Sequence, residues 1–375
     1  MNFSLDFLRQ AARPTVLRGA FPLAAALSLG LAACGPSTTT APTPGGATNP
    51  GASPAAAGGG VNISGAGATA PNPLYQKWLS EFSKANPGTQ IGYESVGSGA
   101  GIKQFLAEKV DFGATDSALK DDDRAKVPAA RGKAIQVPST GLFIVFAYNL
   151  DGVDNLKLSR ESFCGIVDGS IKTWNDPQLT KDNAGVTLPN EPITFVHRSD
   201  GSGTTDIFTS HIAKACPNWK AGSGKSVEWP TGTGAKGNEG VTAQIQQNKG
   251  TLGYTEYSYA KENNLKMAAV QNKAGTFVAP SPEAAAKALE GVTMPEDFAV
   301  KVPDPEGKEA YPIVSLTWLL LYETYPDATK AETLKNFVKW AMKDGKAAAT
   351  ELGYIPLPDE VATKVVAAVE GVKAK

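Results

Sequence analysis

The segment ITFVHRSDGSGTTDIFTSHI, residues 193–212, changes its pattern twice. It begins as a short β-like run, continues through a turn rich in Gly, Ser and Asp, and ends with apolar residues at helical spacing. The turn carries Arg198 and Asp200 directly before the helix. The first N–H groups of a helix lack intrahelical partners and lie at the positive end of its dipole, so an anion can bind there. The segment therefore predicts a strand, turn and helix unit of α/β architecture with an anion site at the helix start.

Two other segments follow the same pattern of strand-like run, glycine-rich turn and helix, and a fourth glycine-rich stretch starts a helix and ends in a strand. The first combines VNIS (61–64), the turn GAGATAPNP (65–73) and a helix bearing Leu74, Trp78 and Phe82. The second combines IGYESV (91–96), GSGAG (97–101) and IKQFLAEKV, and a later glycine-rich stretch is GNEGVTAQIQQNKGTLGY (237–254). One Ser or Thr at a helix start is most often a plain N-cap. Several such turns, together with an arginine and an aspartate, favour an anion site.

Two further runs indicate strands between these units. VDFGATDSAL, residues 110–119, contains a short strand that ends at Asp116. LFIVFAYN, residues 142–149, is a continuous apolar run typical of a strand covered on both faces. A purely structural alternative is that Asp116 caps the Ser117-Ala118-Leu119 turn that follows it.

The N-terminus has the features of an export signal. Three arginines precede the 13-residue apolar run Phe21–Ala33, which is too short to span a bilayer. Residues 1–33 are therefore predicted to be a signal peptide. The run ends in LAACG, which resembles the lipobox of bacterial lipoproteins, and this resemblance implies that Cys34 carries lipid; the alternative is a buried cysteine after an ordinary signal. Residues 34–60 consist mostly of Gly, Ala, Pro, Ser and Thr and are predicted to be a lipid-anchored flexible linker.

Charge and length limit the classes of protein. The whole chain has 36 basic and 37 acidic residues, and without residues 1–33 it keeps 33 and 36, a net charge of −3. This balance argues against nucleic acid as a partner. Residues 61–375 are numerous enough for two domains. The apolar run Ile313–Tyr322 is too short to cross a membrane, so we expect membrane contact only through the lipid anchor. We also expect the protein to be a monomer in the cell envelope.

Cysteines and histidines give no sign of a metal site or a cofactor. Cys164 and Cys216 would meet an oxidising compartment after export, and the sequence leaves open whether they form a disulfide or remain two buried thiols. The two histidines, His197 and His211, have no nearby Cys or carboxylate at a spacing that suits a metal ion. We expect no metal and no cofactor.

Two enzyme-like patterns can be compared with their templates. The sequence GSGKS (222–226) looks like the end of a phosphate loop, but Trp219 stands where the leading glycine belongs and VEWP follows where a helix should begin. His197, Asp200 and Ser202 supply the residue types of a hydrolase triad, but they are crowded into six residues without a Gly-x-Ser-x-Gly elbow. A secreted phosphatase or esterase remains an alternative function.

The motifs taken together resemble a known family. The stretches are GAGATAPNPLYQKW, VGSGAGIKQF, VDFGATDSAL, HRSDGSGTTDIFTSHI, GNEGV and GTLGYTEYSYA. In this order they resemble the motifs of the phosphate-binding proteins that feed the bacterial phosphate ABC importer, over Val61 to about Pro358. The resemblance implies a type II periplasmic-binding-protein-like fold: two α/β domains with mixed sheets flanked by helices, joined by hinge strands around a ligand cleft. It also implies a non-enzymatic protein that binds inorganic phosphate with high affinity and delivers it to ABC importer permease subunits.

The resemblance implies particular roles for residues of this chain. The anion ligands would be Thr69, the backbone N–H of Ala70, Ser98, Asp116, Arg198, Ser202, Gly203 and Thr204, with Asp200 holding the arginine. The sequence departs from the family at Ala70, where a bulky aromatic residue is common, and at His197, where a second basic residue often precedes the arginine. Another oxyanion, such as sulfate or molybdate, is the alternative ligand for the same fold.

Domain boundaries follow from where the chain is expected to cross between the domains, near Ser139 and near Tyr311. Domain I would comprise residues 61–138 and 311–375, and domain II residues 139–310. The ligands carried over from the family would then come from both domains and meet across the cleft.

Overall fold

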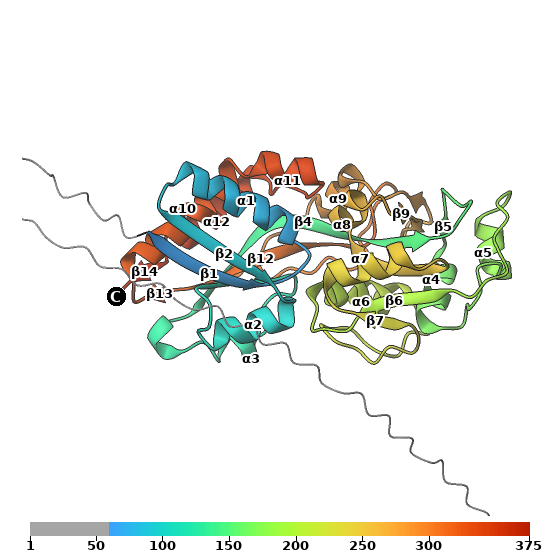
Figure 1. Ribbon diagram of the computed structural model, residues 1–375, viewed down its shortest axis with the longest axis horizontal. Helices are drawn as coiled ribbons and strands as arrows, with labels where there is room; N and C mark the ends of the chain where they lie inside the picture. Colours follow the sequence, from blue (N-terminus) through green and yellow to red (C-terminus); the bar gives the residue numbers. More distant parts are fainter. Residues whose placement is uncertain (1–59) are drawn as a thin grey trace, which may run out of the picture. The chain divides into compact units, whose positions relative to one another are not determined.

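The computed structural model describes residues 60–375, so the predicted signal peptide, Cys34 and all of the linker except Gly60 lie outside the described residues. The described chain is built on a mixed sheet of nine strands (Figure 1). Eight of them follow the order β2-β1-β3-β12-β4-β8-β6-β7, and β9 pairs with β4. Helices cover the sheet, which agrees with the predicted α/β class.

The first part of the sheet comes from the N-terminal units of the sequence. Its elements are β1 (Val61–Gly67), α1 (Asn72–Ala85), β2 (Thr89–Ser95), α2 (Ser98–Leu106) and β3 (Phe112–Thr115). The three strands are parallel, with β1 between β2 and β3. Leu74, Trp78 and Phe82 are buried on one face of α1, as their spacing predicts. A proline occupies the first turn of α1, where its missing N–H costs no helical hydrogen bond.

Two antiparallel strands form the centre of the sheet. The 16-residue strand β4 (Ala134–Asn149) pairs with β12 (Val314–Tyr322) over Ala134–Phe143 and with β8 over Ile144–Asn149. A bulge at Ser139 shifts the β4 and β12 register between Thr317 and Trp318. Every residue of β12 and all of β4 except Asn149 are buried. The two apolar runs of the sequence are therefore covered strands, as predicted.

The second part of the sheet repeats the arrangement of the first. Its elements are β6 (Thr194–Arg198), α6 (Gly203–Ala215), β7 (Thr233–Ala235), α7 (Gly237–Gln247) and β8 (Thr251–Glu256). The strand β6 runs parallel to both of its neighbours, β7 and β8. In each part, the carboxyl ends of the parallel strands lead into the glycine-rich turns that the sequence predicts. The turns of the two parts lie together near the centre of the molecule (Figure 1).

The remaining elements cover the sheet or extend its edges. They are α3 (Asp121–Arg124), a 3₁₀ turn (Ala129–Arg131), β5 (Lys157–Leu158), α4 (Arg160–Asp168), α5 (Pro177–Asp182), α8 (Tyr257–Glu262), β9 (Lys266–Met267), β10 (Ala269–Gln271), β11 (Phe277–Val278), α9 (Pro282–Leu289), β13 (Thr324–Tyr325), α10 (Ala328–Lys343), α11 (Lys346–Leu352), α12 (Asp359–Val369) and β14 (Lys373–Ala374).

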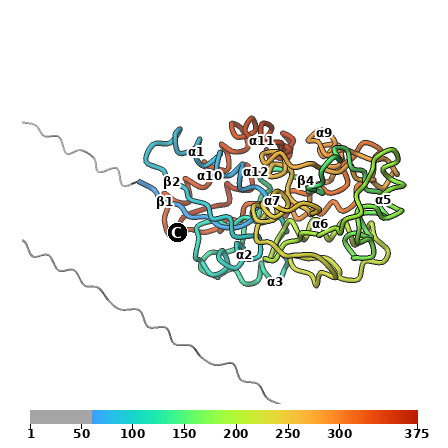
Figure 2. Tube along the Cα trace, turned by 45° about the vertical axis from the view of Figure 1, so that its right-hand side comes forward, coloured from blue at the N-terminus to red at the C-terminus, as the bar shows by residue number. Residues whose placement is uncertain are grey.

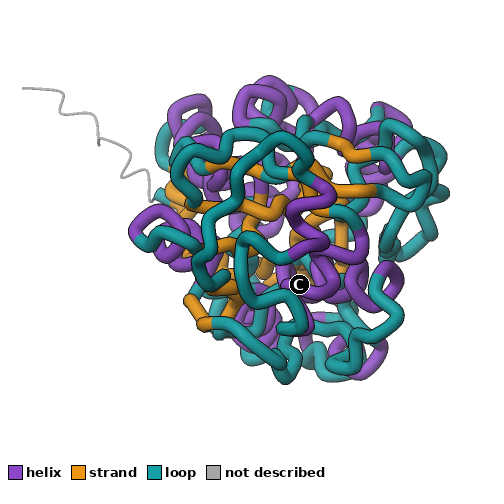
Figure 3. The backbone as a smooth tube through the Cα atoms, turned by 90° about the vertical axis from the view of Figure 1, so that its right-hand side faces the viewer, coloured by secondary structure: helices purple, strands orange, loops and turns teal. Residues whose placement is uncertain are grey.

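The helices lie on both faces of the sheet. Near β1 and β2, helices α1, α10 and α12 lie on one side and α2 and α3 on the other (Figures 1 and 2). Viewed from the end, most strands lie inside a shell of helices and loops (Figure 3). No helix within residues 60–375 combines the length and the apolar character needed to cross a membrane.

A disulfide joins Cys164 in α4 to Cys216, the residue that ends α6, with the two Cα atoms 5.5 Å apart. Of the two states that the sequence left open, the described structure has the disulfide.

Candidate functional site

Two helices begin at the turns where the two parts of the sheet meet. Helix α2 begins at Ser98 after Gly97, whose φ of 89° suits glycine. Helix α6 begins at Gly203, and the Ser202 hydroxyl accepts a 3.0 Å hydrogen bond from the Thr205 N–H as its N-cap. Both helix starts are buried, so their free N–H groups and positive dipole ends lie in the interior, at the centre of the molecule.

Arg198, the last residue of β6, is held rigidly by Asp200. Its Nε donates to Asp200 Oδ1 at 2.7 Å and its Nη2 to Asp200 Oδ2 at 2.5 Å. The Gly237 N–H donates to the same carboxylate at 3.0 Å. Burial acts to raise the pKa of Asp200, but hydrogen bonds and charge from Arg198 outweigh it, so the pKa is lowered and the ion pair is kept. The guanidinium is thus fixed in one orientation before any ligand arrives.

Asn238 links hydroxyl groups from the two parts of the sheet. Its backbone N–H and side-chain Nδ2 donate to Thr69 Oγ1 at 3.1 and 2.7 Å, and Nδ2 also donates to Thr204 Oγ1 at 3.0 Å. Arg198 Nη1 donates to the same Thr204 oxygen at 3.2 Å. Asn238 Oδ1 accepts from Glu256 N and Thr255 Oγ1, which fixes the orientation of the amide.

Three buried hydroxyls therefore have oxygens that accept hydrogen bonds from the protein. Thr69 and Thr204 accept from Asn238, and Ser98 accepts from the Asp116 N–H at 3.1 Å. None of the three donates to a partner within residues 60–375. Since each hydroxyl has one hydrogen to donate, these three hydrogens are available to an acceptor brought by a ligand.

Asp116 is the opposite case, an acceptor that lacks donors. Both carboxyl oxygens are buried and have no hydrogen-bond partner among the described residues. Burial raises the pKa of Asp116 to about 7, although the nearby Thr317 hydroxyl, the charge of Arg198 and the Ser98 hydroxyl all act to lower it. Asp116 does not cap the turn that follows it, because the Ser117 N–H donates instead to Thr115 Oγ1 at 3.0 Å. A buried carboxyl without partners is costly unless a ligand supplies a donor.

The site has two walls, one around the turn at residues 97–99 in the first part of the sheet and one around the turn at residues 201–203 in the second part. The two walls touch one another. The Gly99 N–H donates to the Gly201 carbonyl at 2.7 Å. A Cβ at Gly203 would lie 2.4 Å from Ser98 Oγ and 2.6 Å from Asp116 Cβ, and one at Gly97 would lie 2.3 Å from Asp200 Oδ2. Glycine is required at these positions because the opposite backbone approaches so closely. The structure is therefore in a closed arrangement.

The structure brings the residues singled out in the sequence to one place. Arg198 bonds directly to Asp200 and Thr204, and Asn238 links Thr204 to Thr69. Ser98 and Asp116 lie against Gly203. Ala70 follows Thr69 and is buried, and its carbonyl accepts from the Tyr354 hydroxyl at 2.7 Å. Sequence reasoning missed Asn238, although it stands in the GNEGV motif at the start of α7. The only local signal is an asparagine in the first turn of a helix behind a glycine with positive φ.

The triad residue types do not form a triad in the described chain. Ser202 Oγ caps α6, Asp200 holds Arg198, and His197 Nδ1 lies 3.0 Å from the Arg198 carbonyl oxygen while its ring stacks on Trp229. No hydrogen bond joins the three side chains among residues 60–375. That part of the chain also holds no cluster of His, Cys, Asp and Glu able to bind a metal ion.

Comparison with known proteins places the chain among binding proteins. The PBP superfamily domain matches residues 39–344. The chain is 44% identical over 311 residues to the phosphate-binding protein PstS of Pasteurella multocida, covering 81% of this chain and 88% of the relative. It is 40% identical over 312 residues to PstS of Haemophilus influenzae, covering 81% and 91%. Among solved structures, a high affinity periplasmic phosphate-binding protein (PfluDING) bound with phosphate matches with a TM-score of 0.70 and 25% identity, covering 82% of this chain and 93% of that one.

Proposed function

The chain belongs to the PBP superfamily and, within it, to the family of phosphate-binding proteins that serve ABC importers, and we propose that the site around Asp116 and Arg198 is where it holds phosphate. It binds inorganic phosphate with high affinity for import, and as a substrate-binding protein it is not an enzyme. The resemblance drawn from the sequence motifs is confirmed at the level of family, fold class and function.

The observation that carries the site proposal is that hydroxyl donors and a carboxyl acceptor lie in the same site without pairing with each other. Within residues 60–375, the hydroxyls of Thr69, Ser98 and Thr204 donate to no acceptor in the hydrogen-bond geometry, and the Asp116 oxygens accept from no donor. Inorganic phosphate near neutral pH offers both functions, because its charged oxygens accept hydrogen bonds and its remaining proton can be donated. The same ion satisfies both sets of groups.

The remaining contacts come from backbone N–H groups and one charge. The N–H groups of Ala70, Gly203 and Thr204 lie at or near turns and helix starts, where orphan donors are available. The Ser202 N–H already donates to the Lys225 carbonyl at 2.8 Å, so Ser202 can reach the anion only through its hydroxyl. The Arg198 guanidinium, oriented by Asp200, supplies a full positive charge. The buried setting strengthens each of these interactions relative to water.

Delivery of phosphate requires the site to open, and we propose two domains that do so. Domain I comprises residues 61–138 and 311–375 and domain II residues 139–310, linked through β4 and β12. The support is the change of partner within β4, from β12 to β8, between Phe143 and Ile144. Opening at these strands would separate Thr69, Ser98 and Asp116 from the α6 start, and closure would reunite them.

For location, we propose a monomer outside the cytoplasm, exported by residues 1–33 and tethered by a lipid on Cys34. The N-terminal apolar run and the LAACG sequence support this proposal. The test expresses the full chain with Cys34→Ala, alongside Ser37→Ala as a control in the same linker. Wild type and Ser37→Ala should sediment with membranes after a high-salt wash, and Cys34→Ala should not. A Cys34→Ala protein that stays with the membranes would refute the anchor.

Calorimetric titration with phosphate, sulfate and arsenate tests the function. We expect tight binding of phosphate and arsenate, which share tetrahedral shape and a retained proton, and no measurable binding of sulfate at millimolar concentration. Tight sulfate binding would assign the site to another oxyanion. A parallel assay with a phosphate ester should show no turnover above the buffer control.

A further inference from the structure

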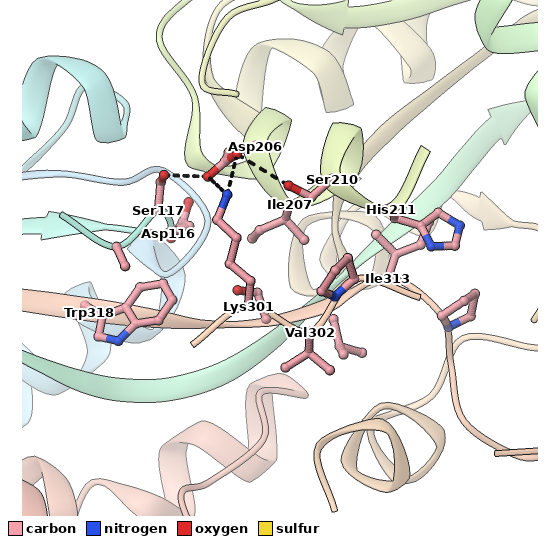
Figure 4. A pocket seen from close by; sticks show the side chains of 15 residues that line it. Asp116, Ser117, Asp206, Ile207, Ser210, His211, Lys301, Val302, Ile313 and Trp318 are labelled. Carbon is pink, nitrogen blue, oxygen red and sulfur yellow. Dashed lines mark hydrogen bonds and ion pairs between the residues drawn. The ribbon is translucent and has the colours of Figure 1, made fainter. Parts of the chain in front are cut away.

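Asp206 in the first turn of α6 carries a buried carboxylate that the phosphate site does not use. Its side chain is 6% exposed, and Lys301 Nζ lies 2.9 Å from both of its oxygens. On the other side, the Ser117 hydroxyl donates to Oδ2 at 2.5 Å. Figure 4 shows Lys301 reaching toward both oxygens of Asp206, with Ser117 on one side of the carboxylate and Ser210 of the same helix on the other.

Ser117 and Asp206 come from different parts of the fold, and Lys301 lies with Asp206 in the proposed domain II. Ser117 follows Asp116 directly beyond β3, in the first part of the sheet. Asp206 follows the anion-binding turn of α6, in the second part. The hydrogen bond between Ser117 and Asp206 therefore spans the two walls, and it lies one residue from Asp116 on one wall and two residues from Thr204 on the other.

Lys301 lies in a segment, residues 297–304, that is bound to both walls. On the first wall, Gln136 Nε2 donates to the Asp297 carbonyl at 3.3 Å and Trp318 Nε1 donates to the Phe298 carbonyl at 2.9 Å. On the second wall, the Arg160 guanidinium binds Asp304 with two hydrogen bonds of 3.0 and 2.7 Å. Lys301 stands between these attachments and contributes the charge opposite Asp206.

The cavity lined by Ser117, Asp206 and Lys301 is also lined by Asp116, the one residue that it shares with the proposed anion site. Closing the two walls removes the Asp206 carboxylate from water, and a buried charge is costly unless it is paired and hydrogen-bonded. Ser117 and Lys301 supply that compensation in the closed arrangement. With the walls apart, water can solvate the same carboxylate, so the two partners matter less.

We infer that Ser117, Asp206 and Lys301 form a latch that stabilises the closed, phosphate-bound state, with Asp206 as a positioning residue for closure and not as a phosphate ligand. The inference rests on the proposed function. The latch raises phosphate affinity because the hydrogen bond between Ser117 and Asp206 is made only in the closed state, and because Lys301 compensates the Asp206 charge most where closure buries it. Its loss accelerates phosphate release.

The chain offers a matched control for an ion pair that has no role in closure. Lys330 Nζ lies 2.8 and 2.9 Å from the two oxygens of Asp111, nearly the geometry of the latch, but among the described residues the Asp111 carboxylate bonds only to Ser64 and Lys330, which both lie in the proposed domain I. Lys330→Met and Lys301→Met thus remove the same charge from comparable pairs. Only the second should change phosphate binding.

The experiment measures phosphate dissociation constants by calorimetry and release rates by stopped flow for wild type, Ser117→Ala, Lys301→Met and Lys330→Met. A charged hydrogen bond lost from the closed state weakens binding roughly tenfold. We therefore expect Lys301→Met to weaken phosphate binding roughly tenfold with faster release, Ser117→Ala to weaken it less, and Lys330→Met to match wild type. Lys301 is about half exposed, so its replacement should not prevent folding.

A double substitution separates the latch from a general loss of stability. With Asp206→Asn in place there is no charge left to compensate, so adding Lys301→Met should have no further effect on the dissociation constant. Equal phosphate affinities of wild type, Ser117→Ala and Lys301→Met would overturn the latch while leaving the proposed function intact. A wild-type chain that fails to bind phosphate would overturn the proposed function and the latch with it. An effect of Lys330→Met as large as that of Lys301→Met would reduce the latch to an ordinary structural ion pair.

Discussion

Asp116 is the residue through which the proposed site would discriminate between oxyanions. A carboxylate repels a fully deprotonated anion but accepts a hydrogen bond from one that keeps a proton, and sulfate keeps none near neutral pH. Replacing Asp116 by Asn removes the repulsion and adds a donor. We predict that Asp116→Asn retains much of the phosphate affinity and narrows the preference for phosphate over sulfate at least tenfold, measured by calorimetry. Asp151→Asn, at an exposed position, serves as the control. An unchanged ratio would contradict this role of Asp116.

The burial of Asp116 also predicts how stability depends on pH in the absence of phosphate. Its pKa is raised from 3.8 to about 7, so between these pH values the folded chain holds a proton that the unfolded chain has released. Rising pH therefore costs stability across this window, and the cost is complete above pH 7.

We predict that Asp116→Asn lacks this cost. Urea unfolding at several pH values should show the stability of Asp116→Asn relative to wild type rising from pH 4 to pH 8, by up to roughly 4 kcal/mol at 1.36 kcal/mol per pKa unit. Glu256, whose pKa burial raises to about 8, is present in both proteins and cancels to first order in the difference. A difference that does not vary with pH would show that Asp116 is already ionised at low pH.

At the start of α6, the side chains on the opposite wall determine which residue fits the first position of the helix. Gly203 opens the helix with a backbone that any residue could adopt, yet its missing Cβ makes room for Ser98 and Asp116. We predict that Gly203→Ala weakens phosphate binding roughly tenfold to hundredfold, because an added methyl group at such distances forces the walls apart. The control is Gly240→Ala in α7, where the nearest atom lies 3.7 Å from the new Cβ. That substitution should leave the affinity unchanged and stabilise the helix by up to about 1 kcal/mol.

Comparing Gly203→Ala with Gly240→Ala separates the effect of contact between the walls from the effect of helix propensity on phosphate affinity. Both replacements improve the intrinsic helix preference of their segment, so any loss of binding confined to Gly203→Ala comes from contact across the cleft. Equal affinities of the two variants would mean that the walls do not approach each other in the bound state as they do in this structure.

For the molecule as a whole, the closed arrangement predicts a measurable change on binding. The proposed ligand groups lie on both walls, and hydrogen bonds join these walls in this structure. We predict that small-angle scattering gives a larger radius of gyration without phosphate than with saturating phosphate, because the proposed domains separate when the ion leaves. Lys301→Met, which removes a latch partner, should need more phosphate to reach the compact profile. Superimposable profiles with and without phosphate would contradict hinge closure.

Much of the fold and of the site could be predicted from local patterns. Helical spacing of Leu74, Trp78 and Phe82 gave the buried face of α1, and the apolar run 142–149 gave a covered strand, because both signals depend only on residues close in sequence. The glycine-rich turns marked where helices begin, and Arg198 with Asp200 in one of them marked the charge that an anion needs.

Contacts between distant segments could be decided only by the tertiary structure. The single strand β4 serves both parts of the sheet, and its change of partner depends on β8 and β12, which are far away in the chain. Asn238 joins Thr69 to Thr204 because α7 begins against the opposite wall, a fact that no local pattern contains. Ser117, Asp206 and Lys301 are unremarkable in sequence, and they form one cluster only where three segments meet. Local propensity is set by neighbouring residues, whereas burial and pairing depend on which surfaces the folded chain brings together.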